Sequence, residues 1–180
     1  MSLPVPANEA ERLKALHDLE ILGTEAEPAF DALVEAAREI FKAPIALVSL
    51  VGEDQQWFKA KCGLSVDSTS RDLAFCAYTI MDDRITIVPD ATKDPRFKDN
   101  ALVTGDPNIR FYIGCPIALK QGEALGSLCV IDRVARMPTP HQVQQLKRLA
   151  VVLEGLLRAH HDVKNAERLL ASARSDGPAA

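Results

Sequence analysis

The sequence has few aromatic residues, no long apolar run and no cluster of positive charge. Aromatic side chains make up only 5% of the 180 residues. No apolar run approaches the roughly 20 residues that a bilayer-spanning helix needs. Residues 1–6 have neither the basic start nor the apolar core of a secretory signal. With 21 basic against 25 acidic residues, the composition disfavours nucleic acid and anionic membranes as partners. We therefore expect a cytoplasmic protein.

Motifs of common enzyme classes are also missing. The chain has no G-x-S-x-G, no P-loop, no H-E-x-x-H and no dinucleotide-binding fingerprint. Its histidines lie on the terminal segments, away from the cysteines, which disfavours a Cys–His nucleophile pair. The four cysteines, Cys62, Cys76, Cys115 and Cys129, lack the close spacing of a zinc site, and their apolar neighbours are typical of buried residues. Cys76 is the exception of interest if it faces a pocket.

What the chain does have is enough apolar residues, 47%, for one domain with a sizeable core. Helical spacing and a capping-box pattern at Asn8 and Glu11 predict a helix from Asn8 to Glu20. A second such pattern, at Thr24 and Glu27, predicts a helix that starts near Pro28 and ends at residues 42–44. Apolar runs predict strands at 45–51 and 56–62, paired as a hairpin, and a third strand at 85–88. Between them we expect a loop at 67–70 and a short helix at 72–81. Residues 90–108 are mostly polar, and we expect a loop with at most one short helix. Such long loops often bind ligands.

The most informative stretch is residues 109–132. Two apolar runs flank a polar connection containing Gly122, a pattern that predicts a β-hairpin. Gly114 and Gly126 interrupt these runs, and a glycine inside a strand marks a bulge or a close approach to the backbone. The hairpin is therefore expected to belong to a sheet with helices on one face and a cavity on the other. This arrangement suits a small-molecule sensor better than an enzyme.

A long helix is predicted to begin at the capping box of Thr139 and Gln142. Its leucines are spaced in steps of three and four, as in a coiled-coil seam, although an amphipathic helix packed on its own sheet has the same spacing. We expect the helix to pack on the sheet first and to continue as an arm that forms a homodimer, with residues 172–180 frayed. The predicted dimer interface consists of Leu146, Leu149, Leu153 and Leu156.

Taken together, these residues resemble a bacterial GAF domain of the subgroup found with histidine kinases and diguanylate cyclases. The matching segments include Trp57-Phe58, Arg71-Asp72, Phe75-Cys76-Ala77, Asp94-Pro95-Arg96-Phe97 and Gly126 to Asp132. The resemblance covers residues 9–160, after a flexible lead at 1–8 and before a helix extension at 161–180. It implies an α+β fold: a central antiparallel sheet of five or six strands, with the N- and C-terminal helices on one face and a ligand pocket on the other.

The resemblance also implies a signalling role. The expected function is a regulatory domain that senses an unknown small molecule and passes the change through its terminal helices to an output partner such as a histidine kinase or cyclase. Tyr78 stands where the subgroup often has histidine, and the cyclic-nucleotide and bilin signatures of other members are missing. No cofactor is therefore named. Two alternatives remain: a thiol-dependent enzyme like the free methionine sulfoxide reductases, and a ligand-free dimerisation module.

The predicted pocket combines aromatic walls with a few polar groups, as small-ligand sites commonly do. Trp57 and Phe58 are adjacent on a strand and must face opposite sides of the sheet, so only one of them can face the pocket. Several of the aromatic residues fit a core role equally well, and the arginines fit ion pairs that hold loops. The candidate ligand-binding residues are Trp57, Phe75, Cys76, Thr79, Arg96, Phe97, Arg110, Phe111 and Tyr112, with Tyr112 the first choice.

Overall fold

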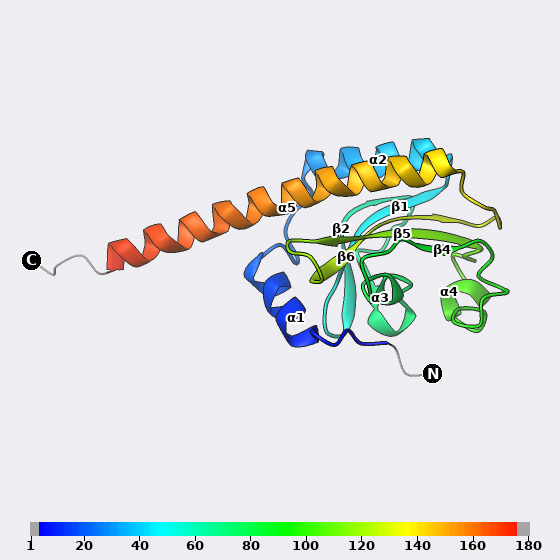
Figure 1. Cartoon of the computed structure of the whole chain (residues 1–180), viewed down its shortest axis with the longest axis horizontal. Coiled ribbons are helices and arrows are strands. Elements are labelled where there is room, and N and C mark those ends of the chain that lie inside the picture. The colour runs from blue at the N-terminus through cyan, green and yellow to red at the C-terminus, as the bar shows by residue number, and fades with distance from the viewer. Residues whose placement is uncertain (1–3, 176–180) are drawn as a thin grey trace, which may run out of the picture.

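The computed structural model describes residues 4–175, and its centre is a six-stranded antiparallel sheet in the order β3-β2-β1-β6-β5-β4 (Figure 1). The sheet confirms the predicted α+β architecture, and both predicted hairpins form. The strand β3 is an addition, because its three polar residues had indicated a loop. The strands are β1 (Ile45–Val51), β2 (Gln55–Cys62), β3 (Ser68–Ser70), β4 (Thr86–Val88), β5 (Phe111–Ala118) and β6 (Ala124–Asp132).

The helices divide between the two faces and one end of the sheet. Helices α2 and α5 contact each other and cover one face, while α3 and α4 lie with the long loops on the opposite face (Figure 1). Helix α1 lies at the end of the sheet, where Asn8 Nδ2 donates to the carbonyl of Gly122 in the β5–β6 turn. The helices are α1 (Glu9–Asp18), α2 (Pro28–Phe41), the 3-10 turn η1 (Arg71–Leu73), α3 (Cys76–Thr79), α4 (Ala101–Thr104) and α5 (Pro140–Ser175).

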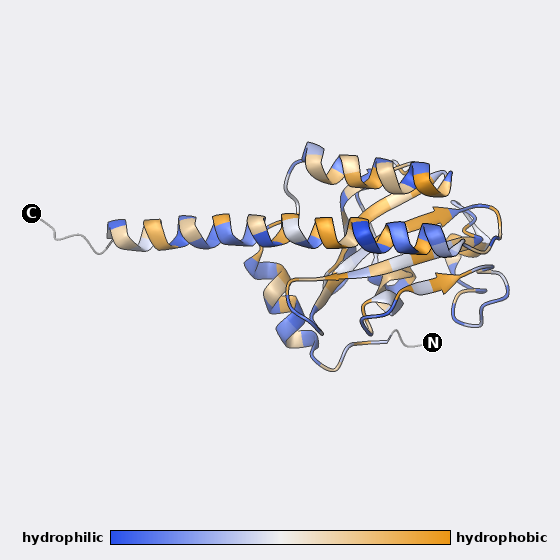
Figure 2. Ribbon diagram, turned by 45° about the horizontal axis from the view of Figure 1, so that its top comes forward, coloured by the Kyte–Doolittle hydropathy of each residue, from blue (hydrophilic) through white to orange (hydrophobic). Residues whose placement is uncertain are grey.

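Each face of the sheet has its own hydrophobic core, and the apolar residues concentrate along the strands that separate the two (Figure 2). Adjacent residues of β5 show the division. Phe111 belongs to the core under α2 and α5, whereas Tyr112 belongs to the core on the opposite face. Successive side chains of a strand alternate between faces, so each apolar strand supplies both cores.

A bulge in β2 modifies this alternation. The β1–β2 register shifts between Val48 and Ser49, so one extra residue is inserted opposite β1. Phe58 joins the core on the α3 side, while Trp57 and Ala60 pack on the helix side. Lys59 also reaches the helix side, where its buried ammonium pairs with Glu27 of the α2 N-terminus at 2.6 Å.

Two of the three predicted capping boxes do not form. Glu27 precedes α2 without a side-chain cap, because its carboxylate binds Lys59, and Thr24 Oγ1 donates to the Ile21 carbonyl. Asn8 likewise makes no cap for α1. At α5 the predicted box is confirmed: the Gln142 amide donates to Thr139 Oγ1 at 3.2 Å and the Thr139 amide to Gln142 Oε1 at 3.0 Å.

Helix α5 corrects the predicted dimer seam. Leu146 and Leu153 are fully buried in the core that α5 forms with α2 and the sheet, and they have no surface left for a second chain. Leu149 and Leu156 are partly buried against the same core. The first half of the leucine pattern therefore reflects packing within one chain. The helix continues through residues 172–175, which had been expected to fray; residues 176–180, like 1–3 of the predicted lead, lie outside the described part.

None of the helices between residues 4 and 175 is both long and apolar enough to cross a membrane.

Candidate functional site

A cavity of about 220 Å³ lies between the sheet and the loops on the face opposite α2 and α5. Its lining is mainly apolar. The floor comes from β1, β2, β5 and β6, and the walls come from the loop after β2, from β3, and from α3, α4 and the segments beside these helices. The lining residues are Leu47, Gln56, Phe58, Leu64, Ser65, Val66, Ser68, Thr69, Phe75, Cys76, Leu102, Asp106, Pro107, Ile109, Tyr112 and Ile131.

The structure brings three of the predicted ligand residues together at this cavity: Phe75, Cys76 and Tyr112. Thr79 stands directly behind them, with its Oγ1 2.7 Å from the Tyr112 hydroxyl. Both Thr79 and Tyr112 are buried. Tyr112 thus lies on the cavity side of the sheet, and its role as a ligand contact stays a prediction.

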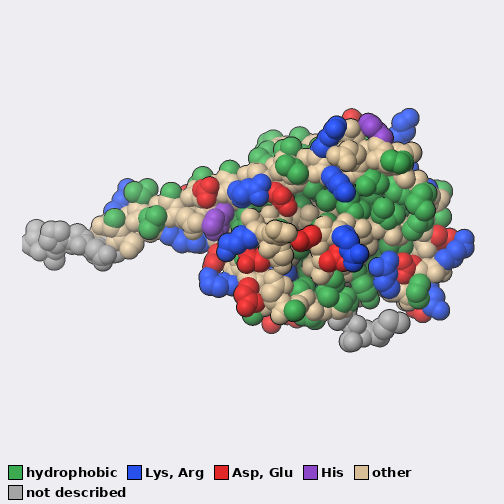
Figure 3. Space-filling view, in the orientation of Figure 1, with side chains coloured by type: hydrophobic (Ala, Val, Ile, Leu, Met, Phe, Trp, Pro, Cys, Tyr) green, Lys and Arg blue, Asp and Glu red, His purple; other side chains and the backbone are tan. Residues whose placement is uncertain are grey.

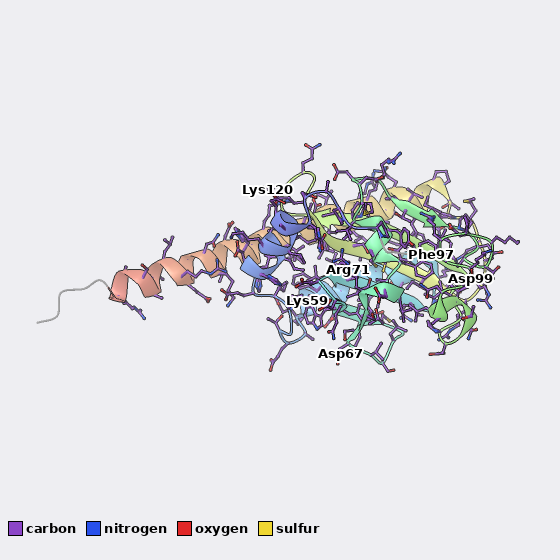
Figure 4. The ribbon with its side chains drawn as sticks, turned by 90° about the horizontal axis from the view of Figure 1, so that it is seen from below. Lys59, Asp67, Arg71, Phe97, Asp99 and Lys120 are labelled. Carbon is purple, nitrogen blue, oxygen red and sulfur yellow. The ribbon has the colours of Figure 1, made fainter. Side chains whose placement is uncertain are left out.

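Phe97 and Arg96 form an outer layer rather than part of the lining. The Phe97 ring stacks on the ring of Phe75, with centroids 4.0 Å apart and planes at 8°, and it is fully buried. Phe97 is labelled in Figure 4. The Arg96 guanidinium pairs with Asp94 at 2.7 Å and lies over the Phe97 ring at 4.9 Å. This layer fixes Phe75 from behind and connects it to the long loop.

Three other predicted residues lie away from the cavity. Trp57 and Phe111 pack on the helix side of the sheet, so their assignment to the pocket is wrong. Arg110 points toward the loop, where its Nη1 donates to the carbonyls of Val103 and Ile109 at 2.9 and 3.0 Å. Arg110 therefore holds the end of α4 against the start of β5.

Gln56 is the most informative residue that the sequence analysis missed. Its Nε2 lies 3.4 Å from Thr69 Oγ1, and its Oε1 is buried with no hydrogen-bond partner among the described residues. A buried acceptor without a partner costs free energy, and it is satisfied when a bound molecule supplies a donor. Alternation along β2 puts Gln56 on the same face as Phe58, so correct placement of Phe58 would have found it.

A cluster of thiols and hydroxyls borders the cavity beside Tyr112. Cys76 Sγ accepts hydrogen bonds from Ser127 Oγ at 3.1 Å and from the Tyr112 hydroxyl at 3.4 Å, and it lies 3.9 Å from Cys129 Sγ. Burial raises the pKa of the Cys76 thiol, but the neighbouring Cys129, Ser127, Ser49 and Tyr112 side chains stabilise the thiolate and bring this pKa below the ordinary value of a thiol. The same proximity raises the pKa of the other thiol, Cys129.

Gly114 makes room for this cluster. A side chain at Gly114 would collide with the Tyr112 hydroxyl and would come within 2.9 Å of Thr79 Oγ1. Gly126 is equally constrained, because a Cβ there would collide with the carbonyl of Ser49 on β1. The prediction that these two glycines mark close approaches is confirmed.

Charge is scarce around the cavity, since Asp106 is the one charged residue in the lining given above. Within residues 4–175, no group of three or more histidine, cysteine or acidic side chains is arranged to hold a metal ion. The arrangement is therefore suited to holding a neutral, mainly apolar molecule through shape and one or two hydrogen bonds.

Comparison with known proteins shows clear similarity in sequence. Residues 25–157 match the family described as GAF domain. A cyclic di-GMP phosphodiesterase of Pseudomonas aeruginosa is 45% identical over 135 residues, which make up 75% of this chain and 23% of that protein. The chain thus spans less than a quarter of the length of this relative.

Solved structures share the fold at low sequence identity. The GAF domain of a phosphoenolpyruvate-protein phosphotransferase from Coxiella burnetii superposes with a TM-score of 0.63 and 19% identity, covering 89% of this chain and 99% of that one. A type II free methionine-R-sulfoxide reductase from Thermoplasma acidophilum superposes with a TM-score of 0.59 and 15% identity, covering 72% of this chain and 90% of that one. At these identities the likeness extends to the fold alone.

Proposed function

Because the chain belongs to the GAF domain family, we propose that it is a sensory domain whose cavity binds a small, neutral, mainly apolar molecule carrying a hydrogen-bond donor. The observation that carries this proposal is the buried Gln56 Oε1 without a partner at the edge of an apolar cavity. A ligand N–H or O–H placed there would satisfy the acceptor, while the surrounding aliphatic and aromatic side chains would cover the rest of the molecule.

Size and charge narrow the ligand class. The cavity of about 220 Å³ is smaller than the ~300–1,000 Å³ typical of pockets for drug-sized ligands. An apolar cavity of ~150 Å³ is large enough for benzene. A single-ring or fused two-ring molecule is therefore the appropriate size. Carboxylates and phosphates are disfavoured, because the charged lining residue is Asp106 and burying an unpaired anion is costly.

Transmission would run from the hairpin to α5. Strands β5 and β6 carry cavity residues on one face and contact α5 with the other. We expect the hairpin and α5 to exchange between two arrangements. A ligand shifts the equilibrium between these arrangements only if it binds the two with different affinities. The match to a cyclic di-GMP phosphodiesterase supports an output partner that is an enzyme of cyclic-nucleotide metabolism. A histidine kinase is the other candidate output partner.

We favour binding over catalysis, since the cavity lining contains no histidine to serve as a general base. One observation favours the reductase alternative, the distance of 3.9 Å between the sulfurs of Cys76 and Cys129. Turnover of free methionine sulfoxide with a thiol reductant would support that alternative, and a chain that binds neutral molecules without turnover would support sensing.

The test uses matched pairs of small probes. Indole, phenol and cyclohexanol would be titrated by calorimetry against indole-3-carboxylate, benzoate and cyclohexanecarboxylate. We expect the neutral probes to bind and the acids to fail. Gln56→Leu should weaken the neutral probes by about tenfold, the loss expected for one hydrogen bond of ~1.4 kcal/mol.

Gln144→Leu, on the exposed face of α5, is the matched control and should leave the affinities unchanged. Equal binding of the acids, or no binding of any neutral probe, would contradict the proposal.

A further inference from the structure

Cys76 and Cys129 differ from the other cysteines in what surrounds their sulfur atoms. Cys115 is buried on the helix side, where burial first and then the nearby Glu154 raise the pKa of its thiol to about 11. Such a thiol is a small inert hydrophobe. Cys76 instead has two hydroxyl groups directed at its sulfur and a second thiol at 3.9 Å.

We propose that Cys76 and Cys129 form an oxidant-reactive dithiol, in which Cys76 reacts with a small hydroperoxide that enters through the cavity and Cys129 then closes a disulfide. Cys76 lines the cavity, whereas Cys129 lies behind it and is fully buried. This geometry gives the two sulfurs different roles: Cys76 meets the oxidant, and Cys129 resolves the product. The inference does not depend on the identity of the sensed ligand.

The chemistry balances with the hydroperoxide as the named oxidant. The Cys76 sulfur attacks the terminal oxygen, the O–O bond breaks, and an alcohol leaves with the proton that Cys76 supplied. This step produces a sulfenic acid. The Cys129 sulfur then attacks the Cys76 sulfur, and the hydroxyl leaves as water with the Cys129 proton. Two thiols lose two electrons in total, and the hydroperoxide becomes one alcohol and one water.

The surroundings favour the first step. Ser127 and Tyr112 donate to Cys76 Sγ, and Thr79 Oγ1 at 2.7 Å from the Tyr112 hydroxyl can donate to it in turn. Hydrogen bonds to the charged form of a thiol favour the thiolate, which is the nucleophile. The second step requires the sulfurs to approach by roughly 2 Å from their present separation of 3.9 Å. The groups around Cys76 are Cys129 and Ser127 from β6, Ser49 from β1 and Tyr112 from β5. Thr79 of α3 contacts Tyr112.

The test treats the reduced full chain with an equimolar amount of tert-butyl hydroperoxide, followed by alkylation and peptide mapping. We expect a mass lower by two hydrogen atoms and a linked pair of peptides containing Cys76 and Cys129, while Cys62 and Cys115 stay alkylated. In Cys129→Ser, Cys76 should be trapped as a dimedone adduct. Cys115→Ser is the matched control and should oxidise as the native chain does.

The rate should depend on pH. Because its neighbours hold the pKa of Cys76 below the ordinary value of a thiol, oxidation should slow by about tenfold per pH unit once the pH falls below that lowered pKa. Tyr112→Phe removes one hydrogen-bond donor to Cys76 and should move the midpoint of the pH–rate profile to higher pH. A merely structural role of Tyr112 would not move this midpoint. Ser127→Ala tests the same point if Tyr112→Phe misfolds. Oxidation of Cys62 or Cys115 before Cys76, or a Cys76 that stays alkylated throughout, would overturn the inference and leave the ligand proposal unaffected.

Discussion

At the scale of single residues, Glu9 binds two arginines and joins α1 to the sheet. Arg12, whose side chain is fully buried, places Nη2 2.8 Å from Glu9 Oε1 and donates from Nη1 to the Val51 carbonyl. Arg71 reaches the same carboxylate oxygen at 2.6 Å and also donates to the Gly52 carbonyl (Figure 4). Burial raises the pKa of Glu9, but the hydrogen bonds from Arg12 and Arg71 outweigh it and leave the pKa below its ordinary value.

We call the contacts of Glu9 with Arg12 and Arg71 the Glu9 clamp. This clamp predicts that the stability of the fold decreases in acid. The pKa of Glu9 is lower in the folded state, so its contribution is complete above the ordinary value of 4.5 and is lost as pH falls through the folded value. Glu9→Gln should remove that part of the pH slope. The substitution should also lower the free energy of unfolding by about 3 kcal/mol at neutral pH, because the buried guanidinium of Arg12 loses its charged partner. Urea unfolding at a series of pH values measures both effects. Glu11→Gln, on the exposed side of α1, should show neither, and equal losses in the two variants would refute the clamp.

Two glycines give a second test at this scale. Gly114→Ala should destabilise the chain by about 1–3 kcal/mol, because the new methyl group collides with the Tyr112 hydroxyl. Gly155→Ala has open space around its Cβ on α5 and should stabilise the chain by about 0.5–1 kcal/mol. Thermal unfolding of both variants decides the matter. A harmless Gly114→Ala would mean that Tyr112 has room to move.

At the scale of elements, α5 combines two different surfaces along one helix. Its first half carries leucines that are buried under α2, and its second half carries apolar side chains in water, among them Leu169 and Leu170 with 72% and 62% exposure. Leu153→Ala should therefore cost about 3 kcal/mol through the cavity that it leaves. Leu169→Ala, outside the side of the helix that carries Val163, should change the free energy of unfolding by less than about 0.5 kcal/mol. Similar losses in the two variants, measured by chemical denaturation, would contradict this division.

Much of the element order could be predicted from the sequence, because apolar runs at 45–51 and 109–132 leave few alternatives to hairpins. The faces of the strands were harder. Alternation shows that Phe111 and Tyr112 point in opposite directions, but only the neighbours in the sheet decide which of them meets the helices. For the same reason the prediction assigned Trp57 to the pocket, where the structure has Phe58. The bulge at Lys59 also shifts the β1–β2 register, and no local sequence pattern reveals this shift. The thiol cluster joins residues on α3, β5 and β6, and such long-range contacts have no local signature.

At the scale of the whole molecule, the second half of α5 projects beyond the domain (Figure 1), with apolar side chains along it (Figure 3). Val163 is 57% exposed, and Leu170 follows seven residues later on the same side of the helix. Because of this spacing we still predict a homodimer. We now expect its contact to lie on the projecting second half of α5 rather than at the buried leucines.

Sedimentation of the full chain should show a dimer, which Val163→Asp with Leu170→Asp should dissociate without loss of helical structure. Gln144→Asp places the same charge near the start of α5 and should leave the dimer intact. A monomer in the native chain would contradict this prediction.

Methyl NMR would show directly whether the cavity beside Gln56 and Tyr112 binds small neutral molecules. Isoleucine and leucine methyl groups report on both cores during a titration with indole. We predict shifts at Leu47, Ile109 and Ile131, which line the cavity, and none at Ile113 or Leu153 on the helix side. Leu102→Phe should reduce these shifts by filling the cavity. Shifts confined to the helix side, or no shifts at any indole concentration, would contradict the account.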